Sequence, residues 1–432
     1  MRKAALSILA FLACGMAGTN AYGQDPVRFE DHFAAQTLRV DYLLGGNSRE
    51  EKVFLWQMKQ EPFYGGPRNR LIDADSTGTY RYAVYDSAGG QLLFSRGFCT
   101  LFQEWRGTPE AGKVRRAYPM SAVMPFPLKT ILFAIDLADY QTGKFNRLFS
   151  MYINPEDYFI LREPVTPYRT VKIVDNGDPA IKVDIVFVAE GYTGKEMNKF
   201  RQDAARMAEY ILSVPPYSEY ASRFNFYRIE SPSVSSGVEI PGQQIYVNTS
   251  VNSSFYTFDM DRYLTTPDTW GMYDIAANAP YDAIIVLDNS TRYGGGGFYN
   301  HYCQSTVDHA LSEIVLVHEF GHSFGGLADE YYTAEVTYSD FYNLKVEPWE
   351  PNITTNVDFG RKWKEMITPG TPVPTPRETQ YKDAVGMFEG GGYVGKGVYS
   401  PMMDCRMKSN EASGYCPVCR QSLIKRIKDL SE

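Results

Sequence analysis

The chain has 432 residues and a formal net charge of −8, and 44% of its residues are hydrophobic. A nucleic-acid-binding protein needs a basic face for the phosphates, so the acidic balance argues against a nucleic acid partner. The length exceeds what one hydrophobic core usually supports, and we therefore expect two domains. Tyr occurs 32 times and Phe 25 times, a composition that can fill β-rich cores.

Residues 1–23 have the pattern of a secretory signal peptide. Two basic residues precede an apolar stretch over residues 4–17, and Ala21-Tyr22-Gly23 forms a small-x-small cleavage site. We therefore expect a secreted or periplasmic protein. Acylation at Cys14, which would give a cell-surface lipoprotein, is the alternative. No later stretch has the roughly 18 apolar residues of a transmembrane helix, and we expect none.

Residues 24–165 are expected to form an all-β sandwich domain. Short segments rich in aromatic and β-branched residues, partly alternating with polar ones, predict strands. The predicted strands cover residues 38–44, 53–58, 80–85, 92–98, 130–135 and 148–153. No constellation of polar residues identifies a ligand there. We interpret the segment as a structural or positioning module, with substrate binding as the alternative.

Residues 166–432 show a different order, in which strands alternate with helices. A proline-containing linker at residues 164–167 precedes this part of the chain. Thr193 and Glu196 form a capping box that predicts the start of a helix. The apolar segments that predict strands are 183–188, 224–229 and 283–287. This order predicts an α/β domain.

A His-Glu-x-x-His motif is the most informative feature of the chain, which has only five histidines. Residues four apart lie on one face of an α-helix, so His318 and His322 can bind one zinc ion. Glu319 lies beside that face and can act as a general base. Asp308 is a candidate N-cap and Gly325-Gly326 a stop signal for this helix. A buried helix whose histidines only form hydrogen bonds is the alternative.

A catalytic zinc usually takes three protein ligands and leaves a fourth position open. In the metzincin pattern the third histidine lies six residues after the second, where this chain has Ala328, which cannot bind zinc. Asp329 is therefore the preferred third ligand and Glu330 the alternative. Consecutive residues usually point apart, so the other carboxylate is expected to turn away. His301 and His309 are off the helical register and are not expected to bind zinc.

The run from His318 to Tyr332, HEFGHSFGGLADEYY, resembles the M64 metallopeptidases, which include bacterial immunoglobulin A peptidases. Residues 183–192, 293–300 and 416–419 are similar to that family as well. The resemblance covers about residues 170–432. It implies a zincin-like α/β catalytic domain after a β-rich domain, zinc as the cofactor, and a protein or peptide substrate. A host glycoprotein such as an immunoglobulin is one candidate substrate.

Gly294 to Gly297 lie between the last predicted core strand and the metal helix. Glycines permit close approach of another backbone, and an extended substrate can bind a strand edge near a catalytic metal. The segment is therefore interpreted as a substrate-binding strand edge. A flexible loop is the alternative, since glycine permits both.

Five cysteines follow the predicted signal peptide. In an exported protein, a single Cys-x-x-Cys pair favours a disulfide over a zinc knuckle. We therefore expect Cys405 to be bridged to Cys416 or Cys419, which would tie residues 401–407 to a C-terminal helix. The methionines of that segment form either a methionine turn beneath the metal or ordinary core contacts.

The sequence thus predicts a secreted zinc endopeptidase in which Glu319 activates water for attack on a peptide bond. Tyr331, Tyr332 and Tyr399 are candidates for stabilising the oxyanion. One alternative is a zinc amidase that acts on cell-wall peptides. Another is an exported non-catalytic binding protein with a structural zinc, although a structural site needs no general base.

Overall fold

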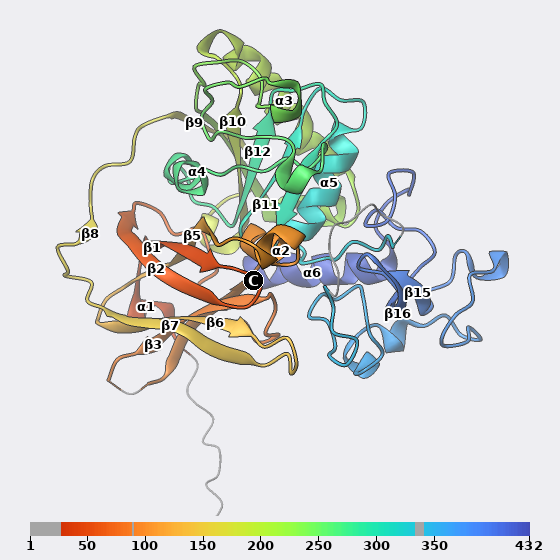
Figure 1. Ribbon diagram of the computed structural model, residues 1–432. Helices are drawn as coiled ribbons and strands as arrows, with labels where there is room; N and C mark the ends of the chain where they lie inside the picture. The colour runs from red at the N-terminus through yellow and green to blue at the C-terminus, as the bar shows by residue number, and fades with distance from the viewer. Residues whose placement is uncertain (1–26, 89, 333–340) are drawn as a thin grey trace, which may run out of the picture.

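The computed structural model describes residues 27–88, 90–332 and 341–432 (Figure 1). The predicted signal peptide and Cys14 lie outside these residues. Within them, an N-terminal β domain is followed by a mixed α/β region. No helix in the described part of the chain combines the length and the apolar character that a membrane span needs.

Eight strands form two four-stranded sheets in the β domain, with the orders β5-β1-β2-β8 and β4-β3-β6-β7. The elements are α1 (Phe29–His32), β1 (Phe33–Gly46), β2 (Glu51–Glu61), β3 (Tyr80–Asp86), β4 (Leu92–Phe98), α2 (Leu101–Arg106), β5 (Arg116–Pro127), β6 (Ile131–Ala138), β7 (Phe145–Ile153) and β8 (Ile160–Leu161). All six predicted strands are present. Alternate residues of the two sheets, such as Val40 and Tyr82, are buried in one shared core.

β5 is the long strand that the sequence pattern does not predict. It contains Pro119, Pro125 and Pro127, and proline cannot donate a hydrogen bond to a strand ladder. The structure accommodates these prolines because β5 lies at a sheet edge and pairs only with β1. Edge position therefore explains why a segment with a weak strand pattern forms a strand.

A six-stranded sheet with the order β13-β14-β12-β10-β11-β9 forms the centre of the α/β region. Its strands are β9 (Arg169–Val174), β10 (Val183–Glu190), β11 (Phe224–Glu230), β12 (Ala283–Asp288), β13 (Gly295–Phe298) and β14 (Tyr302–Thr306). The four inner strands are parallel, whereas the edge strands β9 and β13 are antiparallel to their neighbours. A separate hairpin consists of β15 (Phe388–Gly391) and β16 (Val394–Ser400).

Helices cover both faces of this sheet, as expected for parallel strands. Helices α3 (Met197–Ser213), α5 (Ser312–Ser323) and α6 (Pro417–Ser431) pack on one face, where Ile185 and Phe187 of β10 are buried. Helix α4 (Thr269–Ala276) packs on the other face against Val186 and Val188. α4 and α5 accordingly lie on opposite sides of the sheet in Figure 1.

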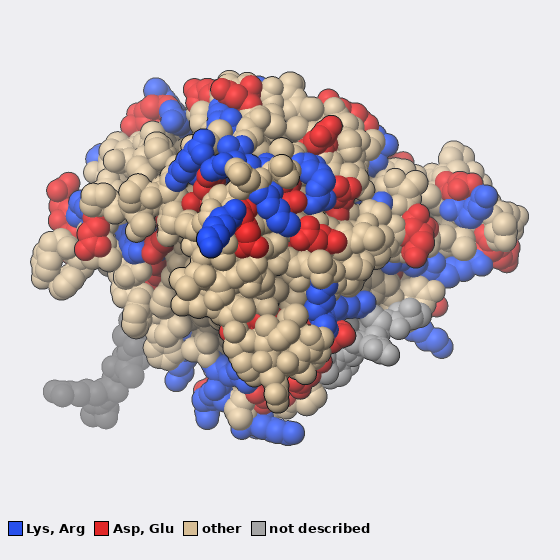
Figure 2. Space-filling view, turned by 90° about the horizontal axis from the view of Figure 1, so that it is seen from above, with Lys and Arg blue, Asp and Glu red and all other residues tan. Residues whose placement is uncertain are grey.

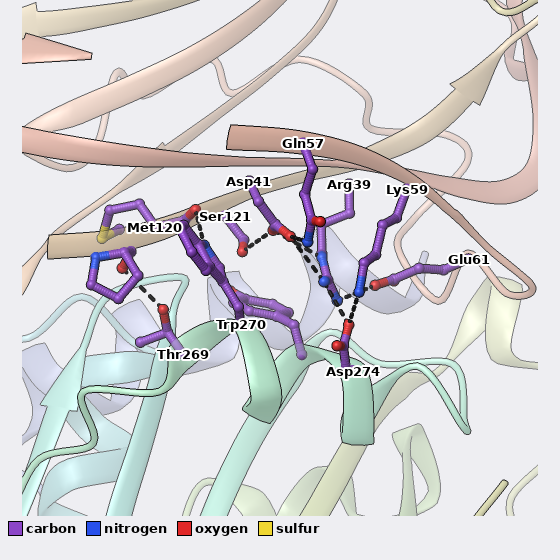
Figure 3. Close-up of polar contacts among 12 residues, drawn as sticks. Arg39, Asp41, Gln57, Lys59, Glu61, Met120, Ser121, Thr269, Trp270 and Asp274 are labelled. Atoms are coloured by element: carbon purple, nitrogen blue, oxygen red, sulfur yellow. Dashed lines mark hydrogen bonds and ion pairs between the residues drawn. The ribbon is translucent and has the colours of Figure 1, made fainter. Parts of the chain in front are cut away.

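The β domain contacts α4 through a polar network centred on the buried Arg39 (Figure 3). The fully buried Arg39 guanidinium donates to Asp41 and Glu61 of its own domain, each at 2.9 Å. It also donates to Asp274 of α4 at 2.6 Å, and Lys59 Nζ lies 2.7 Å from the same carboxylate oxygen. Buried charges are tolerated only when paired, so these contacts hold the two parts of the chain in one relative position.

Acidic and basic side chains are intermixed on the face seen from above in Figure 2. Ion pairs on α3 follow this pattern. Lys199 pairs with Asp203 at 2.8 Å, and Arg206 pairs with Glu313 of α5 at 2.9 Å. The second pair connects α3 to the helix that carries the His-Glu-x-x-His motif.

Candidate metal centre

Helix α5, Ser312–Ser323, carries the His-Glu-x-x-His motif. The predicted N-cap is wrong, because the N-cap position is Leu311, and Asp308 instead pairs with Lys199 at 2.9 Å. The predicted stop signal is confirmed. Gly326 has a φ of +62°, a conformation that glycine adopts without strain, and its N–H donates to His322 O at 3.0 Å.

Three of the predicted ligand atoms converge at the end of α5. His318 Nε2 and His322 Nε2 are 3.1 Å apart. Asp329 Oδ1 lies 3.1 Å from the first nitrogen and 3.3 Å from the second. A tetrahedral zinc ion with bonds of about 2.0–2.1 Å separates its ligand atoms by about 3.3 Å. The triangle therefore has the size that one zinc ion requires.

Backbone carbonyl groups orient both imidazole rings. His318 Nδ1 lies 2.9 Å from Arg406 O, and His322 Nδ1 lies 2.6 Å from Leu327 O. A proton on each Nδ1 can be donated to these carbonyl oxygens. Each Nε2 then keeps its lone pair for a metal ion, as is usual for histidine ligands.

The Asp329 carboxylate is buried and held by a phenol. Tyr393 donates a hydrogen bond to Asp329 Oδ2, and the ring of Tyr331 packs edge-on against that of Tyr393 with ring centroids 5.3 Å apart. Asp329 Oδ1 accepts no hydrogen bond within the described residues, although it faces both imidazoles. A buried carboxylate oxygen without a donor is costly, and a metal ion would satisfy it. The donor set of two imidazoles and one carboxylate therefore fits zinc.

Charge interactions shift the pKa values of this group. Burial opposes the charged imidazolium, but the Asp329 carboxylate outweighs that effect and raises the pKa of His322 to about 9. Burial also acts on Asp329, but the two imidazoles hold the pKa of its carboxyl well below the ordinary value. Burial raises the pKa of Glu319. A metal ion that binds here must therefore displace a proton from the histidine pair.

The ligand group opens into a cavity of about 470 Å³. The side chains of His318 and His322 are 16% and 15% exposed, which leaves room for a further group beside them. The cavity is also lined by Glu319, Gly295, Arg262, Tyr331, Tyr393, Lys408 and, from α2 of the β domain, Glu104. A larger cavity of about 1080 Å³ lies between the β domain and α6, but none of the predicted ligands lines it. The smaller cavity is therefore the candidate site for chemistry.

The glycine-rich segment forms the edge strand β13 beside α5, so the flexible-loop alternative is wrong. A Cβ atom on Gly295 would lie 2.9 Å from Glu319 Cγ, and one on Gly297 would lie 2.4 Å from Glu319 O. Glycine is therefore required for this close packing. Tyr263 already forms an isolated bridge with Gly295, so part of the outer edge is covered. Substrate binding along β13 stays a prediction.

Glu330 points away from the histidine pair. Its carboxylate accepts hydrogen bonds from Asn352 Nδ2 at 3.0 Å and from Cys419 Sγ at 3.2 Å. The predicted disulfide is not formed, because Cys405 Sγ lies 3.7 Å from Cys419 Sγ, whereas a disulfide bond measures about 2.05 Å. The physical reason is that three thiols, including Cys416, share this space with a carboxylate.

His301 and His309, which were not expected to bind zinc, make other contacts. His301 is buried, burial lowers its pKa to about 3, and its Nδ1 lies 3.0 Å from Tyr273 OH. The ring of His309 packs edge-on against Tyr293. Neither histidine belongs to a group of potential metal ligands among the residues that the structure describes.

The methionine-rich segment contributes one residue beneath α5. Met407 is fully buried in the core, and a Cβ atom on Gly321 would lie 2.7 Å from its Sδ. Met402 and Met403 are only partly buried. The contact of Met407 with the metal helix at Gly321 is thus part of ordinary core packing.

Sequence reasoning missed Tyr393, which holds Asp329, and Glu104, which reaches the cavity from the β domain. Tyr393 lies between β15 and β16 with a φ of +64°, far from Asp329 in the sequence. The glycines at 390–392 signal a tight hairpin but not its position. Among the three tyrosines considered for the oxyanion, Tyr331 lines the cavity, whereas Tyr332 packs near Arg377 and Lys408.

Two family models match the chain. The one described as IgA Peptidase M64 matches residues 171–381 and 377–427, and the one described as Peptidase M64 N-terminus matches residues 28–150. The first match contains α5 and Asp329, and the second contains most of the β domain. A search of curated proteins gives no match.

Proposed function

The chain belongs to the M64 peptidase family, and from this premise we propose that it is a secreted zinc-dependent endopeptidase. Family membership implies a metallopeptidase with a protein substrate. The observation that carries the proposal is the triangle of His318, His322 and Asp329 beside Glu319, at the wall of a cavity. The signal-peptide pattern of residues 1–23 supports export.

A zincin-like catalytic domain over residues 166–432 is part of this proposal. Its support is the arrangement of α5, which carries the two histidines, against the antiparallel edge strand β13. The β-sandwich domain over residues 24–165 is proposed to complete the cavity. Tyr263 OH donates to Glu104 Oε2 at 2.5 Å, so α2 of that domain reaches the cavity wall.

In the proposed mechanism, His318 Nε2, His322 Nε2 and Asp329 Oδ1 would hold the zinc ion. Zinc, when bound, lowers the pKa of a water molecule to about 7 and polarises the peptide carbonyl. Glu319 accepts the proton from the attacking water at its carboxylate and then delivers it to the nitrogen of the leaving amine. Arg262 and Lys408 line the same cavity and give it positive charge that favours a developing oxyanion.

The test is Glu319→Gln, measured with a diverse peptide library and with zinc analysis of the same sample. We expect zinc and fold to be retained and turnover to fall by about 100-fold or more, the scale of a lost general base. Glu313→Gln is the matched control. Glu313 lies on the same helix but pairs with Arg206 of α3, so near wild-type turnover is expected.

The same measurements separate the alternatives. Cleavage of ordinary peptides that is lost in Glu319→Gln supports the endopeptidase. Hydrolysis of cell-wall peptides alone would instead identify an amidase. A wild-type protein that holds zinc but cleaves nothing would be a binding protein, and near wild-type cleavage by Glu319→Gln would place the general base elsewhere.

A further inference from the structure

A second group of potential metal ligands lies immediately beyond Asp329 along the chain. The ligand atoms of Glu330, Cys405, Cys416 and Cys419 all lie within 4.8 Å of one another. All four residues are buried, with exposures of 0%, 1%, 4% and 0%. The cluster has three sulfur atoms and one carboxylate. Structural zinc sites have four protein ligands, most often with several thiolates, and a carboxylate oxygen also binds zinc.

The distances within this cluster suit a metal ion better than a disulfide. Cys405 Sγ and Cys419 Sγ are 3.7 Å apart, and Glu330 Oε1 lies 3.2 Å from Cys419 Sγ. Two thiolates bound to tetrahedral zinc at about 2.3 Å lie about 3.8 Å apart. A disulfide would use two of the three sulfurs and leave the third thiol buried beside a carboxylate.

The backbone around the cluster favours thiolates. Cys416 is the N-cap of α6, and Cys419 lies in the first turn of that helix. Cys416 N–H donates to Cys405 Sγ at 3.2 Å, and Cys419 N–H donates to Cys416 Sγ at 3.5 Å. These N–H groups and the positive end of the helix dipole stabilise negative sulfur, which is the form that binds metal.

The Glu330 carboxylate gives independent evidence for a cation. It is fully buried, and its Oε2 accepts no hydrogen bond within the described residues. Leaving a buried carboxylate oxygen unpaired is costly. A divalent ion bound by Glu330 and the neighbouring thiolates would satisfy this oxygen.

We propose that Glu330, Cys405, Cys416 and Cys419 bind a structural zinc ion, separate from the ion of the proposed active site. This ion would join three parts of the chain, namely the segment after α5, the loop at residue 405 and the start of α6. The same loop supports the first centre, because Arg406 O lies 2.9 Å from His318 Nδ1 and Met407 O accepts from Glu330 N at 2.7 Å. The structural ion would therefore hold the backbone that orients His318.

The decisive test is cobalt substitution of the full-length mature protein. The cluster offers three thiolates, whereas the His318, His322 and Asp329 group offers none. We therefore expect thiolate-to-cobalt charge-transfer absorption in the wild-type protein and two metal ions per chain. Cys416→Ser should lose the charge-transfer intensity, and Cys303→Ser, which removes a buried cysteine outside the cluster, should keep it.

The result is independent of the catalytic proposal. His322→Ala should lose one metal ion and keep the charge-transfer band. A wild-type protein without the band, or one whose unreduced digests contain a disulfide between any two of the three cysteines, would overturn the assignment. If Cys416→Ser does not fold, the wild-type and His322→Ala spectra decide the question.

Discussion

The groups around Asp329 and Glu330 differ in their access to solvent although the two residues are consecutive. His318 and His322 are partly exposed to a cavity, whereas Glu330 and Cys419 are completely buried. Catalytic zinc sites keep an open position, and structural sites are closed by four protein ligands. Because neighbouring side chains of an extended backbone point in opposite directions, one step along the chain separates an open group from a closed one.

Removal of each carboxylate in turn should give the largest difference between the two groups. Asp329→Ala should abolish tight metal binding at the histidine pair and reduce peptide hydrolysis to the background rate. Glu330→Ala should keep that metal, with an affinity lower by about 10- to 100-fold, because Glu330 binds in the separate cysteine group and reaches His318 only through the backbone at residues 406 and 407. Calorimetric zinc titration and a peptide cleavage assay measure both. A reversed result, with activity surviving in Asp329→Ala alone, would reject the assignment of Asp329 as ligand.

The two proposed zinc ions should also differ in the rate at which they are released. A chelator should extract one zinc ion rapidly, together with activity, because the histidine pair faces the cavity. The second ion should be released only when the protein unfolds in denaturant, since its four ligands are buried. A chromogenic metal indicator follows both phases over time. Release of both ions in one rapid phase would show that the two groups are equally accessible.

A smaller effect is expected at the phenol that holds Asp329. Tyr393→Phe removes the hydrogen bond to Asp329 Oδ2 and should weaken zinc binding at the open site by about 10-fold, the lower end of the range for such supporting contacts. Tyr399→Phe is the control, because Tyr399 does not line the cavity. Zinc titration of the two variants gives the comparison. Equal affinities would mean that Tyr393 does not support the ligand.

Local patterns predicted much of the molecule. Six strands of the β domain, the Thr193 capping box and the end of α5 follow from periodicity and from helix signals that lie within a few residues. The spacing of His318 and His322 likewise brings two nitrogens to one face of a helix. These features depend on backbone geometry over one or two turns, which the sequence alone specifies well.

Features that depend on distant contacts were not predictable in the same way. The Cys416-x-x-Cys419 pair suggested a disulfide because no sequence signal connects it with the buried Glu330. Tyr393 reaches Asp329 only through the placement of the β15–β16 hairpin. β5 forms because its edge position tolerates proline, and that position is set by the pairing of the whole sheet.

The contacts around the buried Arg39 limit how this protein can be divided into fragments. Asp274 of α4 depends on Arg39 and Lys59 for its counter-charge, and the indole of Trp270 stacks on Trp56 with ring centroids 5.2 Å apart. A fragment that begins at residue 166 would lose both cations and expose an aromatic surface to water. The α/β region is therefore expected to need the β domain, and protein production or inhibitor screening should use both domains in one polypeptide.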